Sequence, residues 1–368
     1  MDAKDTIEKQ PNASLEECRI RLCEKFASIT SSDDAVAQCY LAENDWDMER
    51  ALNSFFEEDM KAVFDADQDA NPKKEPPQTS KNEAGAVDCI DLTEEDPSCS
   101  GADSTDGKRQ QAEPDDDCKL SLLTWNVDGL DTGNLAERAR GLCSVLVLYT
   151  PDVVFLQELI PPYMKYLKKR ATSYIIIEGN EDGYFTGIML KKTRVKLLKS
   201  EIISYPATQM LRNLLVAQVR FLDQDICLMT SHLESCKEQA QERMNQLRVV
   251  LRRMKEAPDN VSVVFGGDTN LRDPEVLKVG GLPAGVCDVW EQLGRQEHCR
   301  YTWDTKGNSN KGLPYVSRCR FDRIYFRPAG TGSRLAPDHM NLVGLEKLDC
   351  GRHISDHWGI YCTFTLAS

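Results

Sequence analysis

The chain has 368 residues, 41% of them hydrophobic, so it can bury a sizeable core and hold more than one structural unit. It contains no run of 18 apolar residues and no apolar segment after its N-terminal charges, so we expect neither a membrane span nor a secretory signal. The 14 cysteines form no CxxC pair, which favours free thiols in a reducing compartment over a disulfide framework or a zinc site.

The charge is unevenly distributed along the chain. Residues 1–118 hold 31 acidic and 12 basic residues, a net charge of −19, whereas residues 119–368 carry +5. A mildly basic body suits a polyanionic substrate, but a solvated acidic linker ahead of it would give the same asymmetry.

Residues 14–57 are predicted to form a compact unit of three short helices. Ser14 and Glu17 make a capping-box pattern before the first helix, and apolar residues follow at helical spacing. The stretch 42–52, Ala-Glu-Asn-Asp-Trp-Asp-Met-Glu-Arg-Ala-Leu, resembles the last loop and helix of ubiquitin-associated (UBA-like) domains. This resemblance implies ubiquitin as a partner; a three-helix cap without a ligand is the alternative.

Residues 58–118 are rich in Pro, Asp, Glu, Ser and Lys, a composition that predicts a disordered acidic linker. One β-prone island interrupts it at 87–96, Val-Asp-Cys-Ile-Asp-Leu-Thr-Glu-Glu-Asp. Such a segment can add a strand to a partner's sheet edge, and it resembles a SUMO-interacting motif. The resemblance implies SUMO as a second partner.

Residues 119–368 read as an α/β body. We expect strands at about 119–126, 151–158, 173–178, 184–191, 195–203, 213–221, 225–231, 261–265 and 321–326, and an irregular stretch at 273–320.

Two longer helices are expected within this body. Capping boxes predict one from Asn134 and Glu137 to Tyr149, and another from Ser235 and Glu238 to about 257. The second has arginines that fall mostly outside its apolar stripe and should form a solvated face: Arg243, Arg248, Arg252 and Arg253.

Polar side chains follow the strands repeatedly. Five strand–loop junctions present Asn126 and Asp128, Glu158, His232, Asp268 and Asn270, and Asp356 and His357. Each has an ordinary structural explanation when taken alone; Asp268, for example, could cap a helix over 270–272. The same pattern at five junctions is hard to attribute to packing and indicates one functional site.

The residue types point to phosphoester hydrolysis. Carboxylates without cysteine favour a hard cation such as Mg²⁺ and argue against zinc. An acid can orient or deprotonate water, and a histidine beside an aspartate can be held as an imidazolium that bonds a phosphoryl oxygen. Metal, amides and histidines around a water-activating acid suit a phosphoester hydrolase.

The motifs also resemble those of a known family. Trp125-Asn126, Leu156-Gln157-Glu158, Ser231-His232-Leu233-Glu234, Gly267-Asp268-Thr269-Asn270 and Ser355-Asp356-His357 resemble, in order, the motif series of the endonuclease/exonuclease/phosphatase family. The resemblance covers about 119–368 and implies a DNase I-like sandwich of two mostly antiparallel sheets flanked by helices.

The resemblance also implies roles for these residues. Mg²⁺, with Mn²⁺ as a substitute, would be bound by Glu158 with Asp128 nearby, and Asp268 would align the attacking water with support from Asn126. His232, Asn270 and His357 would stabilise the phosphate, and Asp356 would orient His357.

Within the family, the segments 123–130, 210–213 and 267–272 most closely resemble phosphodiesterases that release topoisomerase II tyrosine from DNA 5′ ends, leaving a 5′-phosphate for double-strand break repair. This implies a nuclear protein, also present in the cytoplasm. It implies DNA contacts from Asn126, Val127, Asp128, Gly129, Leu130, His232, Leu233, Glu234, Ser235, Cys236, Lys237, Asn270, Leu271 and Arg272, and a groove lined by Arg212, Tyr184 and Trp303.

Two other kinds of function remain open. An abasic-site endonuclease or another phosphoesterase of the family would share the five motifs. A ubiquitin- or SUMO-binding adaptor with an inert hydrolase fold is the non-enzymatic alternative.

Overall fold

The computed structural model describes residues 15–30, 37–38, 41–42, 46, 51, 118–181, 183–332 and 334–367. Helix α1 (Leu15–Thr30) confirms the first predicted helix, and its Phe26 packs with Ala37, Leu41 and Ala51 in a small core. The rest of the predicted 14–57 unit, and the predicted linker up to residue 117 with its motif at 87–96, lie outside the described residues.

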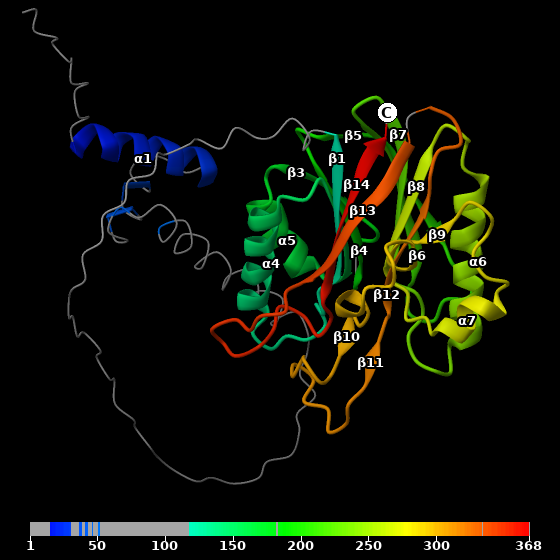
Figure 1. Cartoon of the computed structure of the whole chain (residues 1–368). Helices are drawn as coiled ribbons and strands as arrows, with labels where there is room; N and C mark the ends of the chain where they lie inside the picture. Colours follow the sequence, from blue (N-terminus) through cyan, green and yellow to red (C-terminus); the bar gives the residue numbers. More distant parts are fainter. Residues whose placement is uncertain are drawn as a thin grey trace, which may run out of the picture.

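The body is built on two six-stranded sheets (Figure 1). In spatial order, the first contains β13 (Arg334–Val343), β14 (Gly359–Ala367), β1 (Lys119–Asn126), β2 (Val153–Leu159), β4 (Phe185–Lys191) and β3 (Tyr174–Glu178). The second contains β5 (Val195–Ser204), β6 (Asn213–Phe221), β7 (Gln224–Ser231), β8 (Ser262–Asp268), β12 (Asp322–Arg327) and β9 (Cys287–Asp288). Only the pairs β1–β2 and β7–β8 are parallel among these ladders. The two-sheet, mostly antiparallel α/β fold is therefore confirmed.

Three apolar cores hold the layers together. One lies between the sheets and includes Phe155, Ile188, Leu228, Ile324 and Phe364. A second packs α4 (Leu135–Tyr149) and α5 (Pro161–Arg170) on the outer face of the first sheet. A third packs α6 (Ala240–Glu256) on the outer face of the second sheet, so helices flank the sandwich on both sides (Figure 1). Among the described helices, none is long and apolar enough to cross a membrane.

The expected irregular stretch contains only short elements: α7 (Asp273–Lys278), α8 (Val289–Gln292), the 3₁₀ turn η1 (Glu297–Cys299), and the hairpin of β10 (Trp303–Asp304) with β11 (Arg318–Cys319), besides β9. Residues 270–272 precede α7, so Asp268 does not cap a helix there; its Oδ1 instead accepts from the backbone N–H of Asn270 at 3.0 Å. The helix-cap explanation of Asp268 is thus wrong.

Both predicted capping boxes in the body are wrong, although the helices are present. Asn134 has left-handed backbone angles and no side-chain cap bond, because its amide donates weakly to Glu137 at 3.4 Å. Helix α6 begins five residues after Ser235, at Ala240. The Ser235 hydroxyl is used elsewhere, as the acceptor for Arg212 and Asn270.

Trp125 links the fold to the loop that carries His357. Its ring is fully buried, and its indole N–H donates to the carbonyl oxygen of His357 at 2.9 Å. Two glycines leave room for it: a Cβ on Gly344 would lie 2.3 Å from the ring, and one on Gly359 would lie 2.7 Å from it. The ring therefore fixes where the chain enters β14.

We predict that Trp125→Phe lowers the free energy of unfolding by about 2 kcal/mol, because it leaves a cavity and an unpaired buried carbonyl. Urea unfolding followed by circular dichroism measures this loss. Trp290→Phe is the matched control, because Trp290 is only partly buried and should cost less than about 1 kcal/mol. Equal losses in the two variants would contradict the role assigned to Trp125.

Candidate active site

The predicted strand-end residues converge where the two sheets meet. Asn126, at the end of β1, donates through Nδ2 to Glu158 Oε1 on β2 and to Asp268 Oδ2 at the end of β8, both at 3.0 Å. One amide therefore joins side chains of both sheets. Gly267 permits the close packing beside Asp268, since a Cβ there would lie 2.2 Å from the Ser231 carbonyl oxygen.

Asp268 lies at the centre of the site and is only 2% exposed. Its Oδ2 is 3.3 Å from His232 Nε2 and 3.7 Å from His357 Nε2. Burial alone would raise the pKa of Asp268, but the two imidazoles and the amide of Asn126 face the carboxylate and hold its pKa below the usual range. Asp268 is thus a carboxylate at neutral pH, able to orient water and accept its proton.

The structure corrects the predicted partner of His357. Its Nδ1 lies 2.8 Å from Asp322 Oδ2, in β12, whereas Asp356 accepts from the indole of Trp303 at 3.2 Å. The prediction that Asp356 orients His357 is wrong, because the side chain of Asp356 is engaged by Trp303. Burial opposes the charged imidazole, but Asp322, Asp268 and Asp356 together raise the pKa of His357 well above its ordinary value.

Asp322 is a functional residue that the sequence analysis missed. It is 1% exposed and lies opposite Asp268 in the antiparallel register of β12 and β8. The available signal was an acid inside the apolar strand Phe-Asp-Arg-Ile-Tyr-Phe, since a buried acid normally has a partner.

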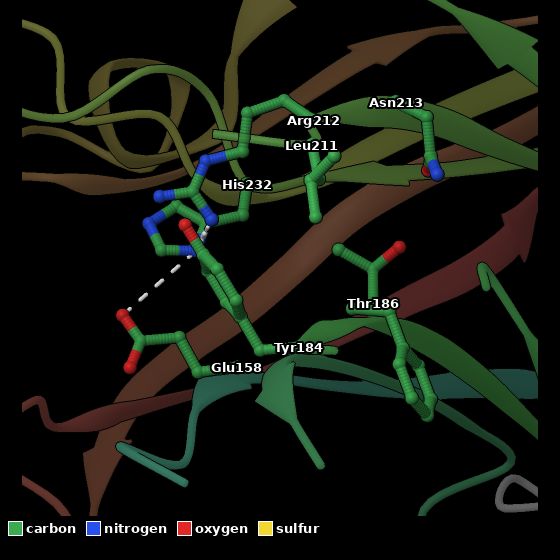
Figure 2. A pocket seen from close by; sticks show the side chains of 8 residues that line it. Glu158, Tyr184, Thr186, Leu211, Arg212, Asn213 and His232 are labelled. Atoms are coloured by element: carbon green, nitrogen blue, oxygen red, sulfur yellow. Dashed lines mark hydrogen bonds and ion pairs between the residues drawn. The ribbon is translucent and has the colours of Figure 1, made fainter. Parts of the chain in front are cut away.

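Arg212 selects the tautomer of His232 (Figure 2). Its Nη1 lies 2.7 Å from His232 Nδ1, and since arginine can only donate, Nδ1 must accept. The ring proton then sits on Nε2, directed at Asp268. The Arg212 guanidinium also lies 4.8 Å from the centre of the Tyr184 ring, and both side chains line a pocket with Glu158 and His232.

Glu158 and Asp128 fit a divalent cation. The loop with Asp128 lies directly against Glu158, because a Cβ on Gly129 would be 2.1 Å from the Glu158 carbonyl oxygen. Asp128 Oδ2 is buried, with no hydrogen-bond partner among the described residues. Burial and the charge of Asp356 raise the pKa of Asp128 to about 7. A buried carboxylate with a free oxygen and a raised pKa would be stabilised by a bound divalent cation.

A second group of possible ligands consists of Asp268, Asp322 and His357, whose ligand atoms lie within 4.8 Å of one another. We favour Glu158 and Asp128 as the metal ligands. In the second group, the raised pKa of His357 favours its protonated imidazole, which already places a positive charge beside the two carboxylates. Binding of a further cation there would therefore be less favourable.

The site loops hold unusual backbone angles. Five residues lie in the left-handed region: Asp128 (φ 51°), Glu158 (φ 58°), Leu211 (φ 57°), Cys236 (φ 62°) and Asn270 (φ 51°). Such conformations cost on the order of 1–3 kcal/mol each and are kept where the surroundings determine them. Their concentration here supports the assignment of the site.

Two fully buried arginines hold these loops, and neither was predicted to do so. Arg138 donates to the carbonyl oxygens of Val127 at 3.2 Å and Asp128 at 3.0 Å. Arg243 donates to those of Glu234 at 2.9 Å and Cys236 at 2.7 Å, and it pairs with Glu275 on α7. The solvated face predicted for Arg243 is therefore wrong.

The structure divides the residues expected to touch DNA. Leu130, Cys236, Lys237 and Arg272 are exposed, and Ser235, Asn270, Tyr184 and Trp303 are partly exposed. By contrast, the side chains of Val127, Leu233, Glu234 and Leu271 are at most 1% exposed, so side-chain contacts to DNA are excluded for them in this conformation. Glu234 instead accepts bonds from Thr208 and from the backbone of Gln209, holding the loop that leads to Arg212.

Comparisons with known proteins find similarity along most of the chain. A profile of the Endonuclease/Exonuclease/phosphatase family matches residues 123–357, and one of the UBA-like domain matches residues 21–62. A Danio rerio relative, Tyrosyl-DNA phosphodiesterase 2, is 64% identical over 96% of this chain and 99% of its own. The Homo sapiens protein of that name is 50% identical over 99% and 97%. A crystal structure of D. rerio TDP2 is 73% identical, with a TM-score of 0.67, and covers 67% of this chain and 99% of its own.

We predict that Asp322→Asn lowers the pKa of His357, since the opposite charge at 2.8 Å is lost while burial remains. The imidazolium would then lose its proton at a lower pH, and the basic limb of the pH–rate profile should move down with it. Nitrogen NMR of labelled histidine measures the pKa directly. Asp356→Asn should give a smaller shift; a larger one would restore Asp356 as the main partner.

Proposed function

The chain belongs to the Endonuclease/Exonuclease/phosphatase family, where it groups with the tyrosyl-DNA phosphodiesterase 2 relatives, and is thus a phosphodiester hydrolase. We propose that it uses Mg²⁺ to hydrolyse the 5′-phosphotyrosyl bond between DNA and a trapped topoisomerase II tyrosine. The product is a 5′-phosphate ready for double-strand break repair. The observation that carries the proposal is the buried carboxyl group of Asp268, held between His232, His357 and Asn126.

The geometry supports direct attack by water. Asp268 orients a water molecule and accepts its proton as the oxygen attacks phosphorus. The imidazolium of His357 and the Nε2–H of His232 donate to the phosphoryl oxygens, where negative charge builds up in the transition state. The bond from phosphorus to the tyrosyl oxygen then breaks, and the DNA keeps the phosphate.

The leaving group needs little help from the protein. A tyrosyl phenol has a pKa of about 10, so it departs as a phenolate and takes its proton from solvent. This agrees with a site whose central acid is held ionised and therefore cannot act as a proton donor.

Glu158 and Asp128 would hold Mg²⁺, with Mn²⁺ as a substitute. When bound, the ion supplies positive charge that stabilises the phosphoryl group during attack. Asp128 and Glu158 come from separate strand–loop junctions, and the contact at Gly129 keeps the two loops together. This division of the ligands makes the metal site depend on the fold of the first sheet.

A single DNA strand end would bind beside the aromatic and arginine side chains of the site. Tyr184 and Arg212 line the pocket beside Glu158, and Arg272 lies over the Phe321 ring at 5.3 Å, next to Trp303. Aromatic side chains can stack on bases while guanidinium groups face the backbone phosphates. The 73%-identical D. rerio crystal structure holds a single-strand DNA product, which supports this assignment.

The binding partners and the cellular location are proposed from the resemblances of the sequence. Ubiquitin would bind through residues 14–57, most of which lie within the UBA-like match at residues 21–62, and SUMO would bind through 87–96. The substrate places the enzyme in the nucleus, with a further population in the cytoplasm. Binding through these regions would recruit the hydrolase to modified protein–DNA adducts.

The substrate is tested with three labelled oligonucleotides: a 5′-phosphotyrosyl strand, a 3′-phosphotyrosyl strand and an abasic duplex. We expect the full-length chain with Mg²⁺ to release a 5′-phosphate from the first alone. Incision of the abasic duplex would overturn the substrate while keeping the metal site.

Matched variants serve as controls for this assay. Glu158→Gln and Asp268→Asn keep side-chain shape while removing the charge that binds metal or activates water. Each should reduce turnover at least about 10³-fold with an unchanged circular dichroism spectrum, and EDTA should do the same to the wild type. Unchanged rates in either folded variant would refute the assigned role.

The binding modules are tested by deletion. Removal of residues 1–117 should leave kcat on the free oligonucleotide unchanged, because every assigned site residue lies between Asn126 and His357. The same deletion should abolish binding to immobilised ubiquitin and SUMO chains. Loss of turnover on deletion would instead mean that residues 1–117 contribute to catalysis.

A further inference from the structure

A lysine from a distant loop reaches the acids beside the proposed metal site. Lys311 lies between β10 and β11, and its Nζ is 2.8 Å from Asp128 Oδ1, 3.7 Å from Asp131 Oδ2 and 3.9 Å from Asp356 Oδ2. We call Asp128, Asp131 and Asp356 the acid cluster. The ammonium of Lys311 thus lies among three carboxylates, one of which is Asp128, a proposed metal ligand.

The loop that carries Lys311 is fixed by two asparagines. Asn308 donates to the carbonyl oxygen of Ser355 at 2.8 Å. Asn310 both donates to the carbonyl oxygen of His353 and accepts from its N–H, each at 2.9 Å. These bonds place the backbone of Lys311 beside the acid cluster. Its side chain remains 36% exposed, so it can leave without movement of the loop.

Asp128 is the member of the cluster that depends most on Lys311. Asp131 has a stronger partner in Arg352, at 2.6 Å, and Asp356 accepts a bond from Trp303. For Asp128, the one side-chain partner among the described residues is the ammonium of Lys311, and its second oxygen is buried and unpaired. When a cation binds Asp128, the carboxylate therefore has to give up only its ion pair with Lys311.

We propose that Lys311 is a tethered counter-ion, which occupies Asp128 in the metal-free enzyme and is displaced when Mg²⁺ binds. The inference rests on the proposed metal site at Glu158 and Asp128. An ammonium and a divalent cation repel each other strongly at neighbouring positions around one carboxylate, so they cannot share it at low cost. Lys311 thereby weakens metal binding to the free enzyme, while it stabilises the buried acid until metal arrives.

The test measures metal binding without DNA. Mn²⁺ is titrated into the full-length wild type, and free ion is counted by electron paramagnetic resonance. Lys311→Met keeps the apolar stem but removes the charge, and it should bind Mn²⁺ about tenfold more tightly. In EDTA the same variant should melt at a lower temperature than the wild type, and it should gain more on addition of Mn²⁺ or Mg²⁺.

Two further variants separate the pairing from general charge. Lys306→Met removes an exposed lysine of the same loop, one without an ion pair in the part of the chain that the structure describes, and should bind like the wild type. Lys311→Arg keeps the charge and should stay close to the wild type.

Each remaining result contradicts a specific claim. Equal Mn²⁺ affinities of wild type and Lys311→Met, with binding still lost in Glu158→Gln, would overturn the counter-ion and leave the metal site intact. Weaker binding by Lys311→Met would show that Lys311 supports the metal and would overturn the displacement. Binding that Glu158→Gln does not reduce would overturn the metal assignment itself.

Discussion

The double hydrogen bond of Asn126 is the contact on which the site depends. Its amide reaches Glu158 within its own sheet and Asp268 in the opposite sheet. The two acids therefore keep a fixed separation only while the sheets stay packed through the core around Phe155 and Ile324. The packing of the sheets therefore also determines the geometry of the site, because the strands that form the core carry the site residues at their ends.

The second constraint is charge. The site gathers acids in a largely buried space, and each is stabilised by a different device: two histidines and an amide at Asp268, an imidazolium at Asp322, and a lysine at Asp128. Since an unpaired buried carboxylate is costly, each such partner offsets part of the cost of burying its acid. Asp128 retains one unpaired oxygen, which is what distinguishes it as a ligand.

Support for the loops comes from further away. Arg138 and Arg243 each extend from the buried side of a helix and bind the carbonyl oxygens of a site loop. These bonds offset the left-handed backbone of Asp128 and Cys236. Rigid helices packed on the outer faces of the sheets thus determine the shape of loops at their ends.

The sequence by itself determined most of the longer strands, most of the loop junctions and the residue types of the site, because apolar alternation and local motifs reflect burial within a short window. It predicted Asn126, Glu158, His232, Asp268 and His357, and the structure brings them together. It missed α5, β13 and β14, whose patterns were not distinctive.

Only the tertiary structure decided which charges face one another. Asp322 in place of Asp356 as the partner of His357, Lys311 beside Asp128, and Ser235 bound to Arg212 in place of a helix cap all join residues at least 23 positions apart. Local periodicity reports that a side chain is buried or at a strand end, but carries no information about the distant group it meets. That pairing follows from the register of β8 with β12 and from the path of the β10–β11 loop.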